Sequence, residues 1–341
     1  MKKTFKKLIM IVAGLGLLLA PQATPAAAKT IELKFATAFS PKHTMQRMVF
    51  EPWAQKINQL TQGRVKVNFF PGGALGKAKD MYSLAEKGIA DIVYTLHDYT
   101  PGRFPLTSVF ELPFMGETAT DFAEAMWRTY AQVPQMQKEY EAVKLLALWA
   151  HPPGSFFTVK KPIRKIDDLK GMKIRTASPF VTKALKEFGA APVSMPVTEI
   201  YTSLERGVVD GTVLPYEAIW VFKMADLVKY ATEKTKFYTM TMTVVMNKKK
   251  WDSLPRDVQK IIDDNSGLAM SLACGKAFDG AESALRKKCL EKGIEAITLP
   301  EAELAKLKAL SQPLSQGWIK DMEAKGLPGR AVLDQAIKLL Q

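Results

Sequence analysis

The stretch PGGALGKAKD, residues 71–80, is rich in glycine and carries two lysines, so it is a candidate phosphate-binding loop. A P-loop has the order Gly, four residues, Gly, Lys and then Ser or Thr, because its hydroxyl must reach a magnesium ion. If Gly76 and Lys77 take the fixed positions, Pro71 stands where the first glycine is needed and Ala78 where the hydroxyl is needed. Two positions therefore do not match the P-loop pattern, and we interpret the stretch as a turn between a strand and a helix.

Other residues that could support catalysis or bind a metal lack the necessary spacing. His43, His97 and His151 are far apart in the chain, and no HExxH or CxxC motif is present. No GxSxG or SxxK motif occurs either. Carboxylates such as Asp91 and Glu199 are expected in any chain of this size. We therefore predict no catalytic residue, no metal site and no cofactor, and keep an exported enzyme only as the last alternative.

The N-terminus has the features of an export signal. Four lysines lie between residues 2 and 7, an apolar run of 13 residues covers 8–20, and small residues lead up to Ala28. This order is typical of a secretory signal peptide, and 13 residues are too few to span a hydrocarbon core of ~30 Å. We predict cleavage near Ala28 and a soluble mature chain that begins near Lys29.

Length and charge limit the class of protein further. Removing 28 of 341 residues leaves 313, which is long for one core and predicts two domains. The net charge of +14 falls to +10 once the four lysines of the signal are removed. A basic chain suits an anionic partner, but the lysines are scattered, with only short runs at 248–250 and 287–288. We expect solvated faces and a small anionic ligand rather than nucleic acid.

The two cysteines, Cys274 and Cys289, lie in a segment, 255–292, that we predict to be one long helix. Fifteen helical residues separate two Cα atoms by ~22 Å, far beyond the ~7 Å limit for a disulfide. We predict that both are unpaired unless the helix breaks near Gly280.

Hydrophobic periodicity predicts two successive series of alternating strands and helices, which favours α/β lobes with largely parallel sheets. The predicted strands are 31–39, 64–70, 90–96, 143–150, 171–177, 191–195, 208–214 and 237–247, and the predicted helices are 44–60, 79–87, 121–142, 181–188, 199–206, 217–233, 255–292, 300–324 and 328–340. In such sheets ligands bind at the carboxyl ends of strands, here in the cleft between the lobes.

Several stretches together resemble the substrate-binding proteins of TRAP transporters, the DctP-like family. They are KGMKIRTASP (170–179), VSMPVTEIYTSLERGVVDGTVLP (193–215), the turn at 71–80, ELPF (111–114) and WDSLP (251–255). Each motif alone is weak, but their order and spacing across the mature chain are fairly specific.

The resemblance implies a two-lobe periplasmic binding protein of the Venus-flytrap type, with hinge strands and a long helix linking the lobes. After the signal peptide, 1–28, lobe I would comprise 29–152 plus about 240–280, and lobe II 153–239 plus about 281–341. Such a protein closes over an organic anion and delivers it to a membrane permease of a small and a large subunit. A sensor or scavenger built on the same scaffold is the alternative.

The family's signature arginine matches Arg175 in the KGMKIR stretch. A guanidinium presents a planar fork that can hold a carboxylate through two charge-assisted hydrogen bonds. The resemblance therefore implies that Arg175, in lobe II, binds the carboxylate of the ligand.

Other ligand-binding positions depart from the polar residues of sialic-acid-binding relatives. By position in the chain, this site would contain Ser155, Leu96, Val197 and Leu214, with Phe39 at a turn of lobe I. Aromatic residues nearby could stack on a ring, although ordinary packing within the lobe explains them equally well; they are Phe156, Phe157, Tyr216 and Trp220.

The predicted pocket thus has one group that binds an anion, Arg175, and mostly apolar walls. We expect a monocarboxylate with an apolar or aromatic body, since a C4 dicarboxylate would leave its second charge unpaired against Leu96 or Leu214. A C4 dicarboxylate or a sugar acid remains the alternative ligand.

Overall fold

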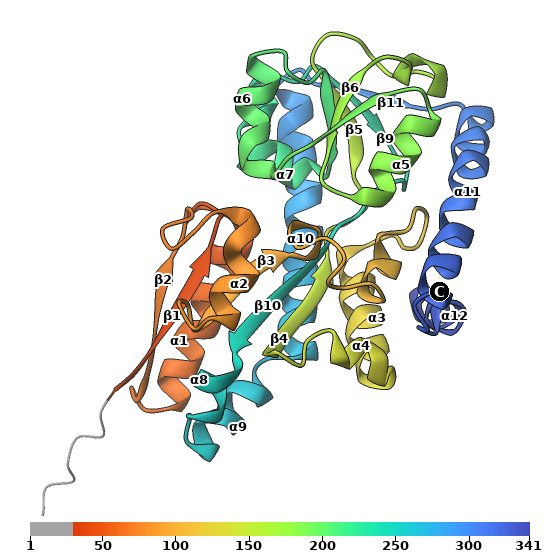
Figure 1. Cartoon of the computed structure of the whole chain (residues 1–341). Coiled ribbons are helices and arrows are strands. Elements are labelled where there is room, and N and C mark those ends of the chain that lie inside the picture. The colour runs from red at the N-terminus through yellow and green to blue at the C-terminus, as the bar shows by residue number, and fades with distance from the viewer. Residues whose placement is uncertain (1–29) are drawn as a thin grey trace, which may run out of the picture.

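The computed structural model describes residues 30–341, and the predicted signal peptide lies outside them. Figure 1 shows two lobes, each built on a β-sheet with helices on its faces. The two-lobed α/β architecture predicted from the sequence is confirmed.

Lobe I contains a five-stranded sheet in the order β2-β1-β3-β10-β4. β1 pairs in parallel with β2 and β3, whereas β10 runs antiparallel between β3 and β4. The strands are β1 (Ile31–Thr37), β2 (Val65–Phe70), β3 (Ile92–Leu96), β4 (Val143–Ala150) and β10 (Thr241–Asn247). β3 and β10 are buried along their whole lengths, and burial on both faces accounts for the nearly continuous apolar sequence of β3.

Lobe II contains a six-stranded sheet in the order β11-β9-β5-β8-β6-β7. Its strands are β5 (Ser155–Thr158), β6 (Lys173–Thr176), β7 (Ala191–Ser194), β8 (Gly211–Leu214), β9 (Tyr230–Glu233) and β11 (Glu295–Thr298). β5, β9 and β11 were not predicted from the sequence. The 217–233 segment, predicted as helical, instead contains the short helix α7 (Tyr216–Val221) followed by β9.

The chain crosses between the sheets twice at one place. Residues 151–154 lead from β4 to β5, and residues 234–240 lead from β9 to β10. The two crossings are hydrogen bonded to each other, with Gly154 N–H donating to the Tyr238 carbonyl (2.7 Å) and the Thr239 hydroxyl donating to the His151 carbonyl (2.6 Å). This pair of crossing segments forms the hinge.

Two long helices also connect the lobes (Figure 1). α10 (Leu268–Glu291) packs against α3 (Ala119–Gln132) and β4 in lobe I and against α7 in lobe II. α11 (Glu301–Glu323) begins against α5 (Pro179–Glu187) of lobe II and reaches lobe I, where Trp318 Nε1 donates to Ser108 Oγ (2.9 Å).

The final helix does not follow the lobe boundary proposed from the sequence. α12 (Gly329–Leu340) packs against α3, so its apolar face is buried in lobe I rather than lobe II. Residues 31–150 and 241–247 supply the strands of the first sheet, and residues 155–233 and 295–298 supply those of the second. The other lobe boundaries stay a prediction.

The helix predicted over 255–292 is two helices, α9 (Arg256–Asp264) and α10. Gly267 separates them with φ of +63°, and its N–H donates to the Leu146 carbonyl (2.6 Å). The break therefore lies at Gly267 and not near Gly280. Cys274 and Cys289 are both on α10, free and buried, as predicted.

A second predicted helix, 121–142, is also divided. α3 ends at Gln132 and α4 (Pro134–Lys138) follows, because Pro134 has no N–H with which to continue the helical ladder. The remaining α-helices are α1 (Glu51–Leu60), α2 (Met81–Glu86), α6 (Ile200–Glu205) and α8 (Lys248–Asp252).

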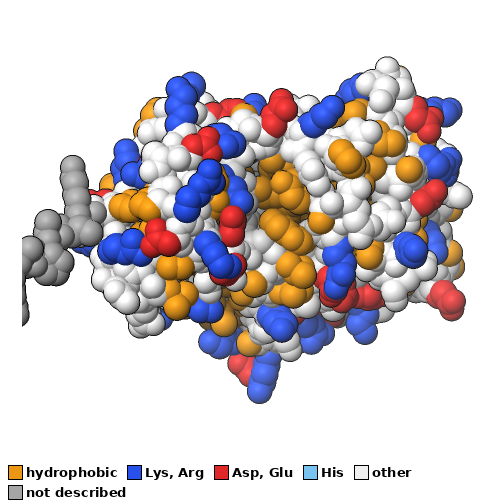
Figure 2. Space-filling model, turned by 90° about the horizontal axis from the view of Figure 1, so that it is seen from below, with side chains coloured by type: hydrophobic (Ala, Val, Ile, Leu, Met, Phe, Trp, Pro, Cys, Tyr) orange, Lys and Arg blue, Asp and Glu red, His pale blue; other side chains and the backbone are white. Residues whose placement is uncertain are grey.

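Charged side chains are distributed over the surface. Figure 2 shows Lys and Arg spread over one face with Asp and Glu between them. No helix within residues 30–341 is both long and apolar enough to cross a membrane.

Candidate functional site

The candidate site is a pocket where the two lobes meet at the hinge. The space between its lining atoms, open solvent included, is roughly 410 Å³. Its lining comes from both lobes, from the hinge and from α10: Phe39, His43, Tyr94, Leu96, His151, Arg175, Val197, Leu214, Pro215, Glu217, Ala218, Phe222, Tyr238, Met240, Met242 and Phe278.

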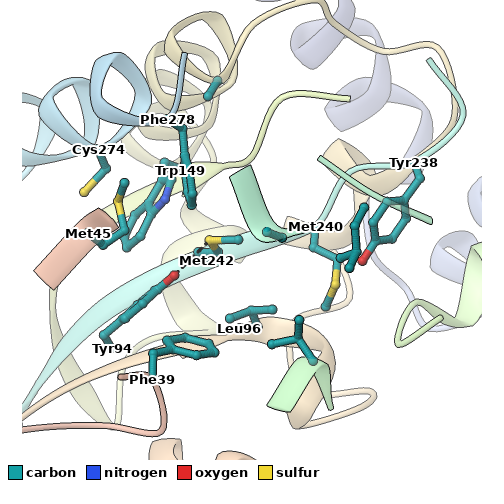
Figure 3. Packing of buried hydrophobic residues seen from close by; sticks show 14 of the residues in the cluster. Phe39, Met45, Tyr94, Leu96, Trp149, Tyr238, Met240, Met242, Cys274 and Phe278 are labelled. Atoms are coloured by element: carbon teal, nitrogen blue, oxygen red, sulfur yellow. Dashed lines mark hydrogen bonds between the residues drawn. The ribbon is translucent and has the colours of Figure 1, made fainter. Parts of the chain in front are cut away.

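Apolar side chains make up most of the walls. Tyr94 and Leu96 are two residues apart on β3, and Met240, the last residue of the crossing segment, is two residues before Met242 of β10. Since side chains two apart on a strand share a face, all four reach the pocket. Figure 3 shows them with Phe39 and Tyr94 toward one end and Tyr238 at the other.

The glycine-rich turn at 71–80 holds Phe39 in place. Gly72 N–H donates to the Phe39 carbonyl (2.7 Å), and Gly73 N–H donates to the Thr37 carbonyl (3.0 Å). Both glycines have positive φ, +67° and +78°, which residues with a Cβ rarely adopt. The stretch is a structural turn that supports the pocket.

Arg175 is fully buried at the end of β6 and points one edge of its guanidinium at the backbone. Nε and Nη2 both donate to the Met195 carbonyl, at 2.9 and 2.6 Å. Nη1 has no hydrogen-bond partner among the described residues. The free part of the fork is therefore the end that carries Nη1 and the second proton of Nη2.

No carboxylate compensates this charge directly. None of the ion pairs within residues 30–341 involves Arg175. The Arg175 charge lowers the pKa of nearby Asp98, but burial and neighbouring Glu111 raise that pKa more strongly. Burial also raises the pKa of Glu111. A buried cation without a counter-ion is costly, so the site favours an anion.

Two further polar groups accompany Arg175, and both belong to the hinge. The Tyr238 hydroxyl is buried without a partner. His151 donates from Nδ1 to the Pro152 carbonyl (2.7 Å), and its Nε2 also has no partner. Burial first, and then the Arg175 charge, lowers the pKa of His151 to about 4. Arg175 and Tyr238 thus supply donors, and neutral His151 supplies an acceptor.

The structure brings five of the eight predicted positions to the pocket: Arg175, Phe39, Leu96, Val197 and Leu214. Ser155 is outside the lining, paired with Leu214 across β5 and β8. Tyr216 and Trp220, four residues apart on one face of α7, are also outside the lining, whereas Glu217 and Ala218 reach the pocket. The Tyr216 hydroxyl donates to Glu233 (2.7 Å), and Lys288 lies over the Trp220 ring.

The remaining aromatic candidates pack inside lobe II. Phe156 stacks on Phe237, and Phe157 meets the edge of Tyr216 with ring centroids 4.8 Å apart. Sequence reasoning did not select His151, Tyr238 or Glu217. For His151 and Tyr238 the sequence did contain a clue, because both are polar residues in the segments that cross between the lobes. Glu217 had no such clue.

The lobes touch each other around the pocket. The Tyr99 hydroxyl of lobe I accepts a hydrogen bond from Val197 N–H of lobe II (3.1 Å). Phe39 of lobe I meets the edge of Phe222 of lobe II, with ring centroids 6.0 Å apart. These contacts cover the pocket, and Arg175 has no exposed surface.

Comparisons with known proteins agree with this architecture. The chain is 33% identical over 319 residues to the outer membrane transporter protein TsaT of Comamonas testosteroni, covering 92% of each chain. It is similar to a TRAP solute-binding protein of Rhodoferax ferrireducens in complex with benzoate (TM-score 0.87, 34% identity, 91% of this chain and 98% of that one). It is also similar to one of Bordetella bronchiseptica with bound mandelate (TM-score 0.86, 31% identity, 91% and 98%).

The family described as bacterial extracellular solute-binding protein, family 7, matches residues 35–321. Its members are binding proteins of extracytoplasmic location and do not catalyse reactions. The resemblance predicted from the sequence is thereby confirmed, and the chain belongs to this family, the DctP solute-binding proteins of TRAP transporters.

Proposed function

We propose that this protein captures an aromatic monocarboxylate in the pocket between its lobes. The observation that carries the proposal is Arg175, fully buried, with Nη1 unpartnered and no ion pair in the described part of the chain. A carboxylate placed at Nη1 and Nη2 would compensate the positive charge of Arg175 and accept hydrogen bonds from both nitrogens. The Tyr238 hydroxyl would supply a further hydrogen bond.

The apolar walls favour a ring over a polar chain. Leu96, Leu214, Met240 and Met242 offer no hydrogen bonds to a sugar or to a second carboxylate. Burying ~150 Å² of ring surface contributes about 4 kcal/mol at ~25 cal/mol/Å², and a charge-assisted bond adds about 1.5–3 kcal/mol. After the cost of association, micromolar binding is a reasonable expectation.

The relatives support the same ligand class. Two similar structures, at 34% and 31% identity, contain benzoate and mandelate. Both ligands combine one carboxylate with one aromatic ring, and that combination matches a pocket with one arginine and apolar walls.

Binding would proceed by closure of the hinge. A ligand that touches both lobes favours the closed form through contacts that the open form lacks. The Tyr99–Val197 hydrogen bond and the Phe39–Phe222 contact are lobe-to-lobe contacts of this kind. The two hydrogen-bonded crossings allow bending without breaking either sheet.

Location and delivery follow from the family and from the N-terminal sequence. The predicted signal peptide would export the chain to the periplasm, where the closed, loaded form would transfer its ligand to a TRAP permease of a small and a large subunit. Deletion of the gene is expected to abolish uptake of the ligand by the cell. Expression of the intact chain should restore that uptake.

A ligand panel tests the proposal. The protein from Lys29 onward would be examined by thermal shift and then by calorimetry with benzoate, mandelate, succinate, 2-oxo acids, glucuronate and sialic acid. A ligand of micromolar Kd at ~1 mM stabilises the fold by about 4 kcal/mol, which raises Tm by several degrees. Stabilisation by benzoate or mandelate alone is expected. Stabilisation only by succinate or the sugar acids would overturn the aromatic assignment.

A further inference from the structure

A chain of hydrogen bonds lies behind the pocket wall at the start of β10. In order along this hydrogen-bond chain, its members are Glu139, Thr107, Tyr140, His97, Thr241 and Glu111. Successive polar atoms are 2.6, 3.0, 2.8, 2.9 and 2.5 Å apart. Thr241 is the first residue of β10 and lies between Met240 and Met242, which line the pocket. The hydrogen-bond chain therefore ends directly behind that wall.

The protons of the hydrogen-bond chain can be counted. Burial lowers the pKa of His97 to about 3, so the ring carries one proton. Each of the three hydroxyl groups carries one more. Four protons cannot supply five contacts. The hydrogen-bond chain is therefore complete only when one of its terminal carboxyls, Glu139 or Glu111, is protonated.

Glu111 is the better place for this extra proton. Glu139 is half-buried, and besides the Thr107 hydroxyl it accepts hydrogen bonds from the N–H groups of Leu106 (2.5 Å) and Thr107 (3.1 Å). Glu111 has no exposed surface and accepts from one backbone N–H, that of Thr241 (3.0 Å). Contact with water and hydrogen bonds from N–H groups both stabilise a carboxylate, so Glu139 is the end that ionises more easily.

Asp98 forms a pair with Glu111. Asp98 Oδ2 and Glu111 Oε2 are buried and have no partner other than each other among the described residues, and both residues line a cavity next to α11. Burial, and then neighbouring Glu111, raise the pKa of Asp98. Two carboxylates that share a site repel each other, whereas one proton between them satisfies both oxygens. The pair is thus suited to bind a further proton.

Asp98 is connected to the carboxylate site through a contact between the lobes. The hydroxyl of Tyr99, the next residue, accepts a hydrogen bond from Val197 N–H (3.1 Å). Val197 lines the pocket, and the carbonyl of Met195, two residues before it, holds Arg175 (2.9 and 2.6 Å). Against the effects of burial and the neighbouring carboxyl, the charge of Arg175 lowers the pKa of Asp98. A carboxylate bound at Arg175 would cancel this influence, and Asp98 would hold a proton more firmly.

We propose that Asp98 and Glu111 form a proton-binding pair behind the carboxylate site, and that the protein takes up a proton when it captures the organic anion. The proposal rests on the proposed function, because Arg175 must bind the carboxylate. It makes Asp98 and Glu111 positioning residues that keep a competing negative charge away from Arg175. Because binding would take up a proton, affinity for the anion falls as the pH rises.

Other titratable groups face the same region. Glu217 lines the pocket, and burial raises its pKa to about 7, so it is the other group that could take up a proton. His151 and Tyr238 stay neutral, because burial lowers the pKa of His151 to about 4 and raises that of Tyr238. Asp321 and Lys325 of α11 line the cavity next to the pair and have opposite charges.

Calorimetry of benzoate binding in phosphate, imidazole and Tris buffers at one pH measures the number of protons taken up, because each buffer adds its own enthalpy of ionisation. If another carboxylate of the ligand panel binds more tightly, it takes the place of benzoate. Uptake of a large fraction of one proton is expected for the unmodified protein. Affinity should be about threefold to tenfold weaker at pH 9 than at pH 6.

Asp98→Asn separates the pair from Glu217. Asparagine cannot bind a proton, but its amide can still donate to Glu111, so the uptake and the pH dependence should disappear while the anion still binds. Glu111→Gln tests the pair a second time and should also reduce the uptake. Glu217→Gln should retain it. Glu139→Gln, at the other end of the hydrogen-bond chain, is the matched control and should retain both the uptake and the pH dependence.

The outcomes separate the two levels of the proposal. If the anion binds in an Arg175-dependent way without proton uptake, the inference is overturned and the proposed function stands. The same conclusion follows if Asp98→Asn keeps the uptake or if Glu217→Gln removes it. If no carboxylate of the panel binds, the inference and the proposed function are both overturned.

Discussion

At the scale of single residues, the pocket is defined by polar atoms that have no partner in the protein. Arg175 Nη1, Tyr238 Oη and Glu217 Oε1 are all buried and unpartnered within residues 30–341. Such atoms weaken the free protein, and a bound ligand would supply the missing hydrogen bonds. Their positions thus report the chemistry of the ligand.

Tyr238→Phe should separate stability from binding. The hydroxyl has no partner in the free protein, so its removal is expected to leave the free energy of unfolding unchanged or slightly higher. Affinity for benzoate is expected to fall by about fivefold to tenfold through loss of one hydrogen bond. Urea unfolding and calorimetry on the same preparation measure both quantities.

Tyr140→Phe is the control, and it is expected to change stability without changing affinity. The Tyr140 hydroxyl is hydrogen bonded to His97 Nε2 (2.8 Å) and to Thr107 Oγ1 (3.0 Å), outside the pocket. This change should cost about 1–2 kcal/mol of stability and leave affinity intact. A Tyr238→Phe protein that binds benzoate normally would remove Tyr238 from the proposed site.

Sequence reasoning at this scale reached Arg175 because the residue lies in a motif of ten contiguous positions. It did not identify His151 and Tyr238, because these residues come close to each other only through the pairing of two hinge segments about 85 residues apart in the chain. It placed Tyr216 and Trp220 by proximity in sequence, whereas the helical period of α7 turns them away from the pocket and Glu217 toward it.

At the scale of elements, the hinge depends on close contact between its two crossings. A Cβ added to Gly154 would lie 2.9 Å from the Leu214 backbone carbon and 2.9 Å from the Tyr238 ring. Gly154→Ala is therefore expected to destabilise the fold by about 2 kcal/mol and to weaken ligand binding, because Tyr238 must move.

Gly280→Ala is the matched substitution within α10. Nothing lies within 4 Å of a Cβ at Gly280, and alanine favours a helix over glycine by about 0.5–1 kcal/mol. This variant should be more stable and bind normally. Denaturant unfolding of both variants measures the contrast, and equal stabilities would contradict the close packing assigned to Gly154.

Elements with a clear periodicity were predictable from the sequence, including the short strands β6, β7 and β8. β1 and β10 alternate, β4 is an apolar run, and α11 and α12 have helical spacing over many residues. β5, β9 and β11 are specified by pairing with neighbours in the sheet instead. The break at Gly267 depends on its contact with Leu146 in β4, which periodicity within one segment cannot indicate.

At the scale of the whole molecule, buried titratable groups act in opposite directions on stability. Burial lowers the pKa of His43 and His97 to about 3 and contributes most to the lowering for His151. Below pH 6.5 the unfolded chain binds these protons and the folded chain does not, so the histidines reduce stability as pH falls toward 4.

Buried carboxyls oppose this effect, and Asp98 and Glu111, whose pKa values are raised, are among them. Burial raises the pKa of Glu139, Glu217 and Glu282 to about 7. Between pH 7 and 4.5 the folded chain binds more protons at these groups than the unfolded chain does, so they add stability as pH falls. The free energy of unfolding should therefore vary little between pH 7 and 5 and fall steeply below pH 4.5.

Urea unfolding at pH 7, 5.5 and 4 measures this profile. Glu139→Gln removes one opposing carboxyl away from the pocket and should make the protein more sensitive to acid between pH 7 and 5. A steep, continuous loss of stability from pH 7 to 5.5 in the unmodified protein would show that the carboxyls do not offset the histidines.

The central claim concerns Arg175, and calorimetric titration of benzoate into the unmodified protein and the Arg175→Ala variant tests it most directly. Circular dichroism of both proteins, with Arg286→Ala as a lobe II control outside the pocket, establishes that each is folded. Micromolar binding by the unmodified protein and the control, with at least about 100-fold weaker binding by Arg175→Ala, is the expected result. Equal affinity in a folded Arg175→Ala protein would contradict the assignment of the carboxylate site.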